Sequence, residues 1–548
     1  MVDSVEDSEK THSGELQPAQ PNGRWQAIAL VATCTLSMIL NTSSATAASI
    51  ALPTIGRDLH IKEEKLQWII SAFSLSSGCL LLFFGRIADL YGRKIVFLGG
   101  IAFLGIFSLG AGFARDEIAI DVLRGVQGIG GAAVIPASLG ILAHAFPPSN
   151  ARSIAFATFA AGAPIGAAVG NLIGGTLTQL TRPTWRSGFF LIAGLSLATF
   201  MGGAFFIDRD KPSEEEDRRV DWLGAFLVTV GLVLIVFVLS EGSIAPHGWK
   251  TPYIIACIVV GFILLLLFVA WQFYLEHLQR ESRLTNSRWT PPPLMKVSIW
   301  TRSRGRMAVI LWIAFLEWSS FLSWAFWVQL YYQNYQELTP VLTMIRLLPM
   351  SVTGCICNVV VALVVGRVRV VFLIVCGTVF TATANLLFAV IKTSSPYWAF
   401  GFPATIVSVF GADFVFAAGT LFVAKISLPH EQSLSGALFQ TMTQLGASFG
   451  LAITTIIFNS ETTRQFNRAN PPQPGGLVGP PKPFDQLSAY RAVMWGGFAF
   501  AMFGALLAAV FLRSVGIVGH QQVPDGEDQN NKAEETTAHG ENEEEKKI

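Results

Sequence analysis

Gly-Arg-Ile-Ala-Asp-Leu-Tyr-Gly-Arg-Lys, residues 85–94, separates two long apolar segments and decides the fold. A polar turn this short permits only a tight helical hairpin, and its glycines let the two helix ends approach closely. Asp89 lies three residues after Arg86 and four before Arg93, so each pair can share a helical face. An exposed pair of this kind contributes only ~0.2–0.5 kcal/mol. That is too little to hold a fold, but it is enough to bias two conformations of similar energy.

The composition is too apolar for an ordinary soluble protein. Of the 548 residues, 52% are hydrophobic and only 14% are charged, and the formal net charge is +1. These values predict an all-α polytopic membrane protein and give no reason to expect a nucleic-acid partner. All six cysteines fall inside apolar segments, so no extracellular disulfide framework is available. No ATP-binding loop, zinc-ligand spacing or nucleophile elbow stands in a loop, so we expect no enzyme, no metal site and no cofactor.

Fourteen segments are apolar and long enough to span a bilayer, which takes about 20 residues per helix. The first residues lack the basic start and apolar core of a signal peptide, so we expect the N-terminus to stay in the cytosol. An even number of spans returns the C-terminus to the cytosol, and the loops on that side hold more Lys and Arg than the opposite loops. The predicted spans are 26–52, 66–84, 95–114, 118–143, 153–180, 188–207, 222–240, 253–274, 307–329, 338–365, 370–391, 398–426, 434–458 and 492–512.

An internal echo indicates two related halves. The sequence Val-Gly-Arg-Val-Arg at 365–369 repeats, in degenerate form, the Phe-Gly-Arg of residues 84–86. If spans one to six match spans nine to fourteen, spans seven and eight are an inserted pair. A basic linker then either lies along the membrane between the halves or is a plain connection. The predicted segments are a cytoplasmic tail (1–25), a first six-helix bundle (26–207), the inserted pair (208–275), the basic cytoplasmic linker (276–306), a second six-helix bundle (307–514) and a disordered acidic tail (515–548).

Two motifs carry a resemblance to a known family. Residues 85–94 match the loop signature of the major facilitator superfamily, and Leu-Arg-Gly-Val-Gln-Gly-Ile-Gly-Gly-Ala at 123–132 matches its fourth-helix motif. With fourteen spans and an inserted pair, the chain resembles the drug:proton antiporter branch. Spans one to six are similar to the fungal aminotriazole and boron resistance type, whose relatives include proposed low-affinity ammonium transporters. The resemblance implies the major facilitator fold, with two six-helix bundles plus two inserted helices.

Arg124 lies about six residues into the fourth span, hence roughly 9 Å along the helix at ~1.5 Å per residue. A charge near the bilayer centre costs at least ~2.5–3.5 kcal/mol on insertion scales, and this position is shallow enough for snorkelling to lower that cost. One interpretation is therefore a snorkelling structural arginine. The resemblance implies instead a role in proton coupling, through the effect of the positive charge on a nearby acid.

The fifth span repeats glycine every four residues, which forms a flat face for close helix packing. Antiporters of the family that the chain resembles carry a Gly-Pro-x-x-Gly-Gly motif here, whereas this chain has an asparagine where the proline is expected. A proline one to two turns earlier supplies a kink. We predict a close-packed hinge, while the inference to antiport is weakened. The motif comprises Gly162, Pro164, Gly166, Gly170, Asn171, Gly174 and Gly175.

The first span also departs from the antiporter pattern, because Asn41 stands where many such proteins have an aspartate. Asn41 cannot carry a proton. Among the acidic residues, only Glu317 and Asp413 lie well within predicted spans. Acidic residues inside a membrane span are functional candidates by default. We predict that both exchange protons. The alternative for each is a hydrogen-bonded structural carboxylic acid that stays neutral.

A substrate cavity is expected around Glu317 and the thirteenth span. Polar and aromatic side chains follow Glu317 at helical spacing and so share its face, and two glutamines four residues apart share a face of the thirteenth span. Interhelical hydrogen bonds explain the two glutamines equally well. Trp327, Tyr331 and Tyr332, near the end of span nine, are expected in an interfacial aromatic belt. The predicted cavity residues are Asn41, Ser320, Phe321, Trp324, Gln440 and Gln444.

The patterns and the resemblance predict a monomeric secondary transporter that exports a small toxic solute, drug or metabolite in exchange for protons, with the lipid bilayer as its surroundings. We expect it in the plasma membrane, with the vacuolar membrane as the alternative. Arg124 would couple to Glu317 and Asp413. The alternatives are an uncoupled facilitator or importer of a small polar solute such as ammonium or boric acid, and a transporter-like membrane sensor. The cytoplasmic side would be latched by Gly85, Arg86, Asp89, Gly92, Arg93 and Lys94.

Overall fold

The computed structural model describes residues 24–146, 150–208, 219–242, 245–280, 290–364, 367–427, 432–470 and 486–513. The predicted acidic tail, all but the last two residues of the predicted N-terminal tail, and residues 281–289 of the predicted linker lie outside the described residues. So do Val365 and Gly366 of the internal echo.

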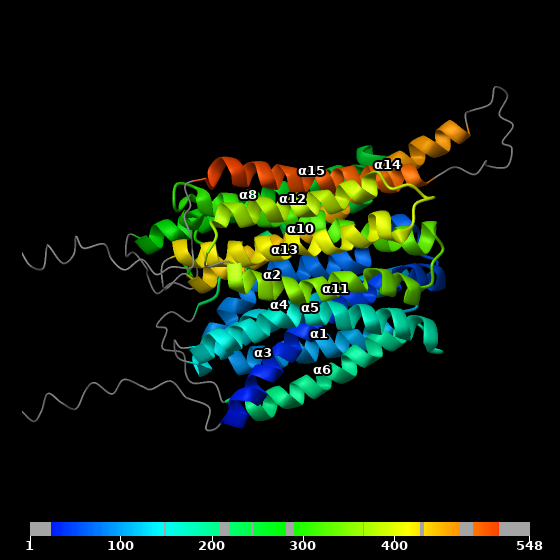
Figure 1. Cartoon of the computed structure of the whole chain (residues 1–548). Helices are drawn as coiled ribbons and strands as arrows, with labels where there is room; N and C mark the ends of the chain where they lie inside the picture. Colours follow the sequence, from blue (N-terminus) through cyan, green and yellow to red (C-terminus); the bar gives the residue numbers. More distant parts are fainter. Residues whose placement is uncertain are drawn as a thin grey trace, which may run out of the picture.

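Fourteen helices are long and apolar enough to cross a membrane, which confirms the predicted number. The described residues form helices and no strands (Figure 1). The spanning helices are α1 (Arg24–Leu59), α2 (Trp68–Tyr91), α3 (Arg93–Gly112), α4 (Glu117–Ala145), α5 (Asn150–Leu180), α6 (Arg186–Phe206), α7 (Trp222–Glu241), α8 (Pro252–Arg280), α10 (Arg306–Leu330), α11 (Pro340–Val364), α12 (Val370–Ala389), α13 (Tyr397–Ile426), α14 (Gln432–Ala469) and α15 (Leu487–Phe511).

Local signals set several helix ends. The side chain of Asp116 caps α4 by accepting from Ala119 N at 2.8 Å, and Asp221 caps α7 by accepting from Gly224 N at 2.7 Å. Gly92 has a φ of 113°, which residues with a side chain rarely adopt, and it separates α2 from α3. Short elements fill the connections: η1 (Glu63–Lys65), η2 (Gly248–Lys250), α9 (Ser298–Thr301) and a π-helical turn, η3 (Tyr331–Tyr335).

Two groups of six helices pack side by side. In the first, α1 lies against α5, and α4 lies against α2 and α3. In the second, α10 lies against α14, and α12 lies against α13 and α15. Figure 1 shows the first group in blue to cyan and the second in green to red. The helices α7 and α8 pack on each other, and α7 also contacts α2 and α14, so the inserted pair touches both groups. We call the two groups the first and the second bundle.

The bundles are joined at the end where α1, α10 and α14 finish, which we call the outer end because the predicted topology places it away from the cytosol. Here α2 packs along α14 and α5 packs along α11. Hydrogen bonds cross both seams: Thr455 Oγ1 donates to Gln67 Oε1 at 2.8 Å, and Val341 N donates to Gln179 Oε1 at 3.0 Å. The two seams therefore close on polar groups as well as on packed side chains.

Glu63, on η1 of the first bundle, accepts hydrogen bonds from two elements of the second. Tyr490 Oη donates to Glu63 Oε1 at 2.7 Å, and Asn334 Nδ2 donates to the same oxygen at 3.0 Å. In the same π-helical turn, Gln333 Nε2 donates to Ile50 O at 2.9 Å. The widened turn thus presents consecutive amide side chains to the first bundle.

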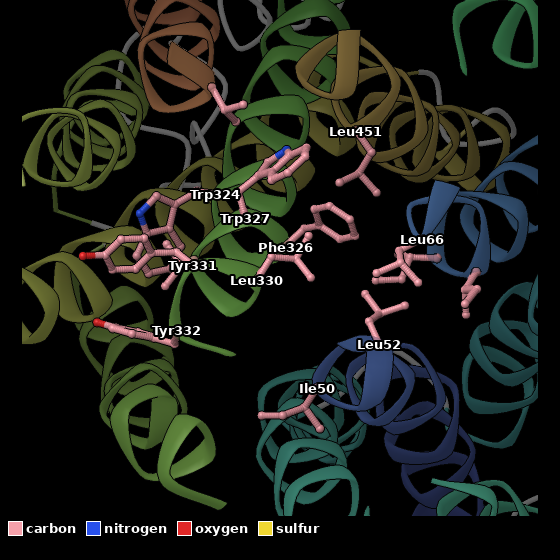
Figure 2. Packing of buried hydrophobic residues seen from close by; sticks show 14 of the residues in the cluster. Ile50, Leu52, Leu66, Trp324, Phe326, Trp327, Leu330, Tyr331, Tyr332 and Leu451 are labelled. Atoms are coloured by element: carbon pink, nitrogen blue, oxygen red, sulfur yellow. The ribbon is translucent and has the colours of Figure 1, made fainter. Parts of the chain in front are cut away.

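The prediction of an interfacial aromatic belt is wrong for Trp327, Tyr331 and Tyr332, which are 0%, 1% and 2% exposed. They lie in the outer-end core, because α12, α14 and α15 surround this part of α10. Trp327 stacks on Phe458 with ring centres 4.4 Å apart, and its Nε1 donates to Thr454 Oγ1 at 3.0 Å. Figure 2 shows this cluster, which also contains Ile50, Leu52 and Leu66 of the first bundle.

The described part of the predicted linker is tied to the inserted pair. Met295 N donates to Gln272 Oε1 at 3.0 Å, and Ser298 N donates to Glu276 Oε2 at 3.1 Å, both on α8. Gln272 Nε2 in turn donates to Asp221, the cap of α7, at 2.5 Å. One network therefore connects the start of α7, the end of α8 and the segment that leads into α10.

Candidate functional site

The prediction of a polar turn over residues 85–94 is wrong in its length, because residues 85–91 continue α2 and only Gly92 separates α2 from α3. Across this break Asp89 of α2 and Arg93 of α3 form an ion pair, at 3.1 Å between Arg93 Nη2 and Asp89 Oδ1. The pair forms although Gly92 interrupts the helix between them. Arg93 Nη1 also donates to Gly140 O of α4 at 3.2 Å, and Lys94 Nζ donates to Ile207 O, after α6, at 2.5 Å. These bonds fasten the start of α3 to its own bundle.

Arg124 is fully buried, at 0% exposure, and does not snorkel to the membrane surface. Its Nε donates to Ile69 O of α2 at 2.9 Å, and its Nη1 donates to Ser44 Oγ of α1 at 3.0 Å. Nη1 also donates to Gln127 Oε1, one turn along α4, at 2.6 Å. The guanidinium lies over the Phe73 ring at 4.5 Å, a favourable arrangement for a cation. Three helices of the first bundle thus hold one positive charge with neutral groups.

Two buried atoms near this network lack a hydrogen-bond partner: Nη2 of Arg124 and Oδ1 of Asn41. Asn41 lies one turn before Ser44 on α1 and faces Gly131 of α4, where an added Cβ would lie 2.5 Å from Asn41 Oδ1. The structure therefore places Asn41 and Arg124 on the same seam between α1 and α4. Asn41 is buried there, and the span has no carboxylate at that position.

The glycine face predicted in the fifth span lies against α1. A Cβ added to Gly166 would meet Ile39 O at 2.7 Å, and one added to Gly170 would meet the Cα of Ser43, also at 2.7 Å. Ser43 Oγ donates to Gly166 O at 2.8 Å, across this contact. Gly162 and Gly174 extend the same face toward the two helix ends.

The remaining residues of that motif turn toward the second bundle or into the first. A Cβ added to Gly175 would lie 2.8 Å from the Cβ of Met344 on α11. Pro164 faces Gly354 of α11, where an added Cβ would be 3.3 Å from the Cβ of Pro164. Asn171 is 8% exposed. The motif thus packs α5 on α1 with one face and on α11 with another.

Glu317 lies in the interior of the second bundle, at 0% exposure. Thr381 Oγ1 of α12 donates to Glu317 Oε1, while Glu317 Oε2 has no hydrogen-bond partner. One turn on, Ser320 Oγ donates to Gly497 O of α15 at 2.7 Å and accepts from Asn385 Nδ2 of α12 at 3.0 Å. The groups around this acid are neutral and come from three helices.

The two bundles repeat one packing frame. Ser319 Oγ donates to Gly446 O of α14 at 2.8 Å, just as Ser43 Oγ donates to Gly166 O of α5. Gly450 then meets the Cα of Ser319 as Gly170 meets the Cα of Ser43. Since Asn41 precedes Ser43 by two residues and Glu317 precedes Ser319 by two, Asn41 and Glu317 occupy equivalent positions.

Asp413 of α13 lies near the seam between the bundles. It interacts with the thiol of Cys357 on α11, and its Oδ2 has no hydrogen-bond partner. A Cβ added to Gly354 would lie 4.0 Å from that oxygen and 3.3 Å from Pro164 of α5. Asp413 is half-buried, whereas Glu317 is enclosed, so the two predicted proton carriers occupy different environments.

The predicted cavity residues lie at three separate places. Ser320 and Trp324 are fully buried inside the second bundle, with Trp324 against Phe388 of α12 at 5.8 Å between ring centres, and Phe321 beside them is half-buried. Gln444 lies instead on the α2–α14 seam, where a Cβ added to Gly78 would be 2.8 Å from its own. Gln440 is one turn away on α14 and half-buried. Asn41 belongs to the first bundle, so the structure does not bring the six into one patch.

Sequence reasoning missed Asp121 and Glu63. Asp121 lies inside α4, one turn before Arg124, and its Oδ1 is buried without a hydrogen-bond partner. Its spacing of three residues from the buried arginine was the signal that could have found it. Glu63 stands in a polar connection, and only the fold brings Asn334 and Tyr490 to it.

Most of the chain is similar in sequence to known transporters. The sequence model of the Major Facilitator Superfamily matches residues 34–221 and 215–451. The chain is 26% identical to MFS-type transporter 1 of Pyricularia oryzae, over 91% of this chain and 86% of the relative. It is 28% identical to the low affinity ammonium transporter of Saccharomyces cerevisiae, over 82% and 81% of the two chains. It is 27% identical to efflux pump terG of Aspergillus terreus, over 89% and 87%.

Solved structures of transporters share the fold. An auto-inhibited peptide transporter of the POT family superposes with a TM-score of 0.62 at 15% identity, covering 91% of this chain and 98% of that one. A human organic anion transporter superposes with a TM-score of 0.55 at 13% identity, covering 88% and 99%. With two bundles, fourteen spans and a family match over more than half of its length, this chain belongs to the Major Facilitator Superfamily.

Proposed function

We propose that the chain exports a small toxic solute, drug or metabolite across the plasma membrane in exchange for protons, with both termini in the cytosol. The observation that carries the proposal is the position of Asp413. Its unpartnered carboxylate oxygen lies close to the Pro164–Gly354 contact between α5 and α11. A relative motion of the bundles changes what surrounds this group, and a carboxyl that gains or loses a proton there changes the free-energy difference between the two arrangements.

In this proposal the closed outer end belongs to the state that loads its solute from the cytosol. Glu63, Gln67 and Gln179 hold the seams together in that state. Opening outward breaks these bonds and separates α5 from α11, which carries Asp413 into a new environment. Arg124 and Glu317 act with it as the further buried ionisable groups, and the Asp89–Arg93 turn latches the cytoplasmic side.

The experiment uses the full chain in sealed vesicles. A growth screen of a deletion strain against drugs, boric acid and ammonium analogues first selects a solute, and its flux is then measured with and without an imposed pH gradient. We expect uphill transport that a protonophore abolishes. Asp413→Asn should lose the uphill component, while Asp208→Asn, at an exposed acid just after α6, should keep it. Flux that ignores the proton gradient in the unaltered protein would contradict the proposal.

One observation favours an uncoupled facilitator of a small polar solute as the second candidate. Asn41 and Asn171 replace the ionisable residue and the proline expected of antiporters, and both are buried in the first bundle. The similarity to a low affinity ammonium transporter agrees with this candidate. Downhill movement of ammonium or boric acid, equal at all proton gradients, would select it over the exporter.

A further inference from the structure

Four side chains follow one another along α4 at spacings of three or four residues: Glu117, Asp121, Arg124 and Gln127. Such spacing places them on one face of the helix. Glu117 is the first residue of α4 at the outer end, and Arg124 lies seven residues further, roughly 10 Å along the axis at ~1.5 Å per residue. A row of polar side chains on this face, which we call the polar path, therefore runs from the outer surface to the buried guanidinium, with Asp121 between them.

The outer entrance of this path is charged. Lys65 Nζ of η1 forms an ion pair with Glu117 Oε1 at 2.8 Å, and the two side chains are 29% and 30% exposed. The hydrogen bond with Glu117 raises the pKa of Lys65, so this lysine stays charged at all physiological pH values. Glu241, at the end of α7, accepts from Trp68 Nε1 at 3.1 Å. The inserted pair thus contributes an acid to the entrance.

The carboxyl group of Asp121 interacts electrostatically with charged side chains from three elements. Glu117 and Arg124 act on it from its own helix, Lys65 from η1 and Glu241 from α7. Two of these groups are cations and two are acids. A proton on Asp121 therefore changes the balance of a compact set of charges, and the change is felt most directly by Arg124, one turn further in.

Asp121 and Arg124 each have one buried atom that is left unbonded. Asp121 Oδ1 and Arg124 Nη2 both lack a hydrogen-bond partner, although the two residues are one helical turn apart. The other nitrogens of Arg124 are engaged with Ile69 and Ser44. A charged Asp121 can attract the unused Nη2, whereas a protonated Asp121 leaves the guanidinium to the neutral acceptors of α1 and α2.

We infer that Asp121 is a proton-exchanging residue of this transporter, reached from the outer end, and that it positions Arg124 in two alternative arrangements. The exchange is a simple one: an O–H bond forms on the carboxylate at the expense of a hydronium ion in the outer water, and the same bond breaks when the proton leaves. Arg124 responds through Ser44, which lies one turn from Asn41 on α1. The first bundle thereby has a proton-exchanging acid on α4, whereas α1 has an asparagine, Asn41, at the position where α10 has an acid.

The inference rests on the proposed exchange of protons, and its test separates the two. Full-length protein in sealed vesicles is compared as the unaltered chain, Asp121→Asn and Asp121→Glu, with solute flux measured against outer pH. Asp116→Asn is the matched control, since Asp116 is an exposed acid that caps the same helix and asparagine caps equally well. We expect Asp121→Asn to lose gradient-driven transport at least tenfold while downhill flux stays within twofold.

The pH profile distinguishes a role in proton exchange from a structural one. Asp121→Glu should retain coupling with a displaced midpoint, because the longer side chain alters the approach to Arg124, and Asp116→Asn should reproduce the unaltered profile. An Asp121→Asn profile that superposes on the unaltered one overturns the inference. If that variant fails to reach the membrane, an unshifted midpoint in Asp121→Glu overturns it instead. If the unaltered chain itself shows no proton dependence, the proposed function falls first.

Discussion

The two bundles share a frame and differ in charge. In each, a serine of the first helix donates to a glycine carbonyl of the fifth: Ser43 to Gly166 and Ser319 to Gly446, both at 2.8 Å. At the position two residues earlier, the first bundle has Asn41 and the second has an acid, Glu317. The first bundle instead buries a cation, Arg124. The repeated serine–glycine bond serves the packing of the helices. The ionisable residues, which differ between the bundles, are the candidates for function.

The two buried ionisable groups are also compensated differently. Arg124 has three hydrogen bonds to neutral acceptors and an aromatic face, whereas Glu317 has a single hydroxyl donor, Thr381. Burying a charged group is costly unless the group is hydrogen-bonded. Removing one partner of a buried interaction destabilises the fold by more than the interaction itself contributes. The difference predicts that the first bundle tolerates loss of its charge less well than the second.

Removing the cation should have the largest effect. Arg124→Gln loses charge-assisted hydrogen bonds of about 1.5–3 kcal/mol each, so we expect gradient-driven transport in vesicles to fall by more than about tenfold. Arg124→Lys keeps the charge but not the fork of donors, and it should recover only part of the activity. Full activity in Arg124→Gln would remove the distinction between the bundles.

Breaking the shared frame should affect both bundles alike. Gly166→Val and Gly446→Val each place a side chain against backbone, with the added Cβ 2.7 Å from Ile39 O in one case and pressed against Phe315 O in the other. Overpacking of this kind costs about 1–3 kcal/mol. Thermal unfolding in detergent should show a lower midpoint for both variants, with Gly436→Val, whose Cβ meets nothing within 4 Å, as the control. A loss confined to one variant would refute the equivalence.

Neutralising the two acids of the second bundle should sharpen the comparison. Glu317→Gln keeps an oxygen that can accept from Thr381, so we expect solute flux against outer pH to change by less than about threefold, the size of a modest hydrogen-bond difference. Asp413→Asn, at the seam, should change the same profile by about tenfold or more. The reverse order would make the enclosed acid the principal proton carrier.

The contact between the bundles should show the smallest effect. Glu63→Gln keeps acceptor geometry for Tyr490 and Asn334 but loses the negative charge, a change of about 0.5–1.5 kcal/mol. The fraction of molecules open at the outer end should rise, as measured by labelling of a cysteine placed at Met344, which is buried against Gly175 of α5. Glu461→Gln, further out on α14, is the control and should leave the labelling rate unaltered.

Much of the fold could be predicted from the sequence, because a span needs only length and apolar composition. Such local patterns predict the fourteen spans and the family to which the chain belongs. They also predict the close packing of the fifth helix. Helix ends were less predictable: α1 continues through Pro53 to Leu59, since a proline in a helix removes only one hydrogen bond. The helix α14 likewise runs on to Ala469.

The site was less predictable, because it depends on which face of a helix meets which neighbour. Helical spacing predicts that Ser320 and Trp324 share a face with Glu317, but it does not say that this face turns into the bundle, toward Asn385 and Phe388. The symmetry between Asn41 and Glu317 emerges only from the two serine–glycine bonds, which join residues more than a hundred positions apart.

The hydrogen bonds that close the outer end have a consequence for the medium in which the protein works. They pair neutral donors with amide or carboxylate acceptors, as in Thr455 to Gln67, Val341 to Gln179 and Tyr490 to Glu63. Mobile ions screen interactions between full charges over a Debye length of about 8 Å at physiological ionic strength, but they act weakly on short contacts between dipoles. The opening of this end should therefore be nearly the same in dilute and in saline surroundings.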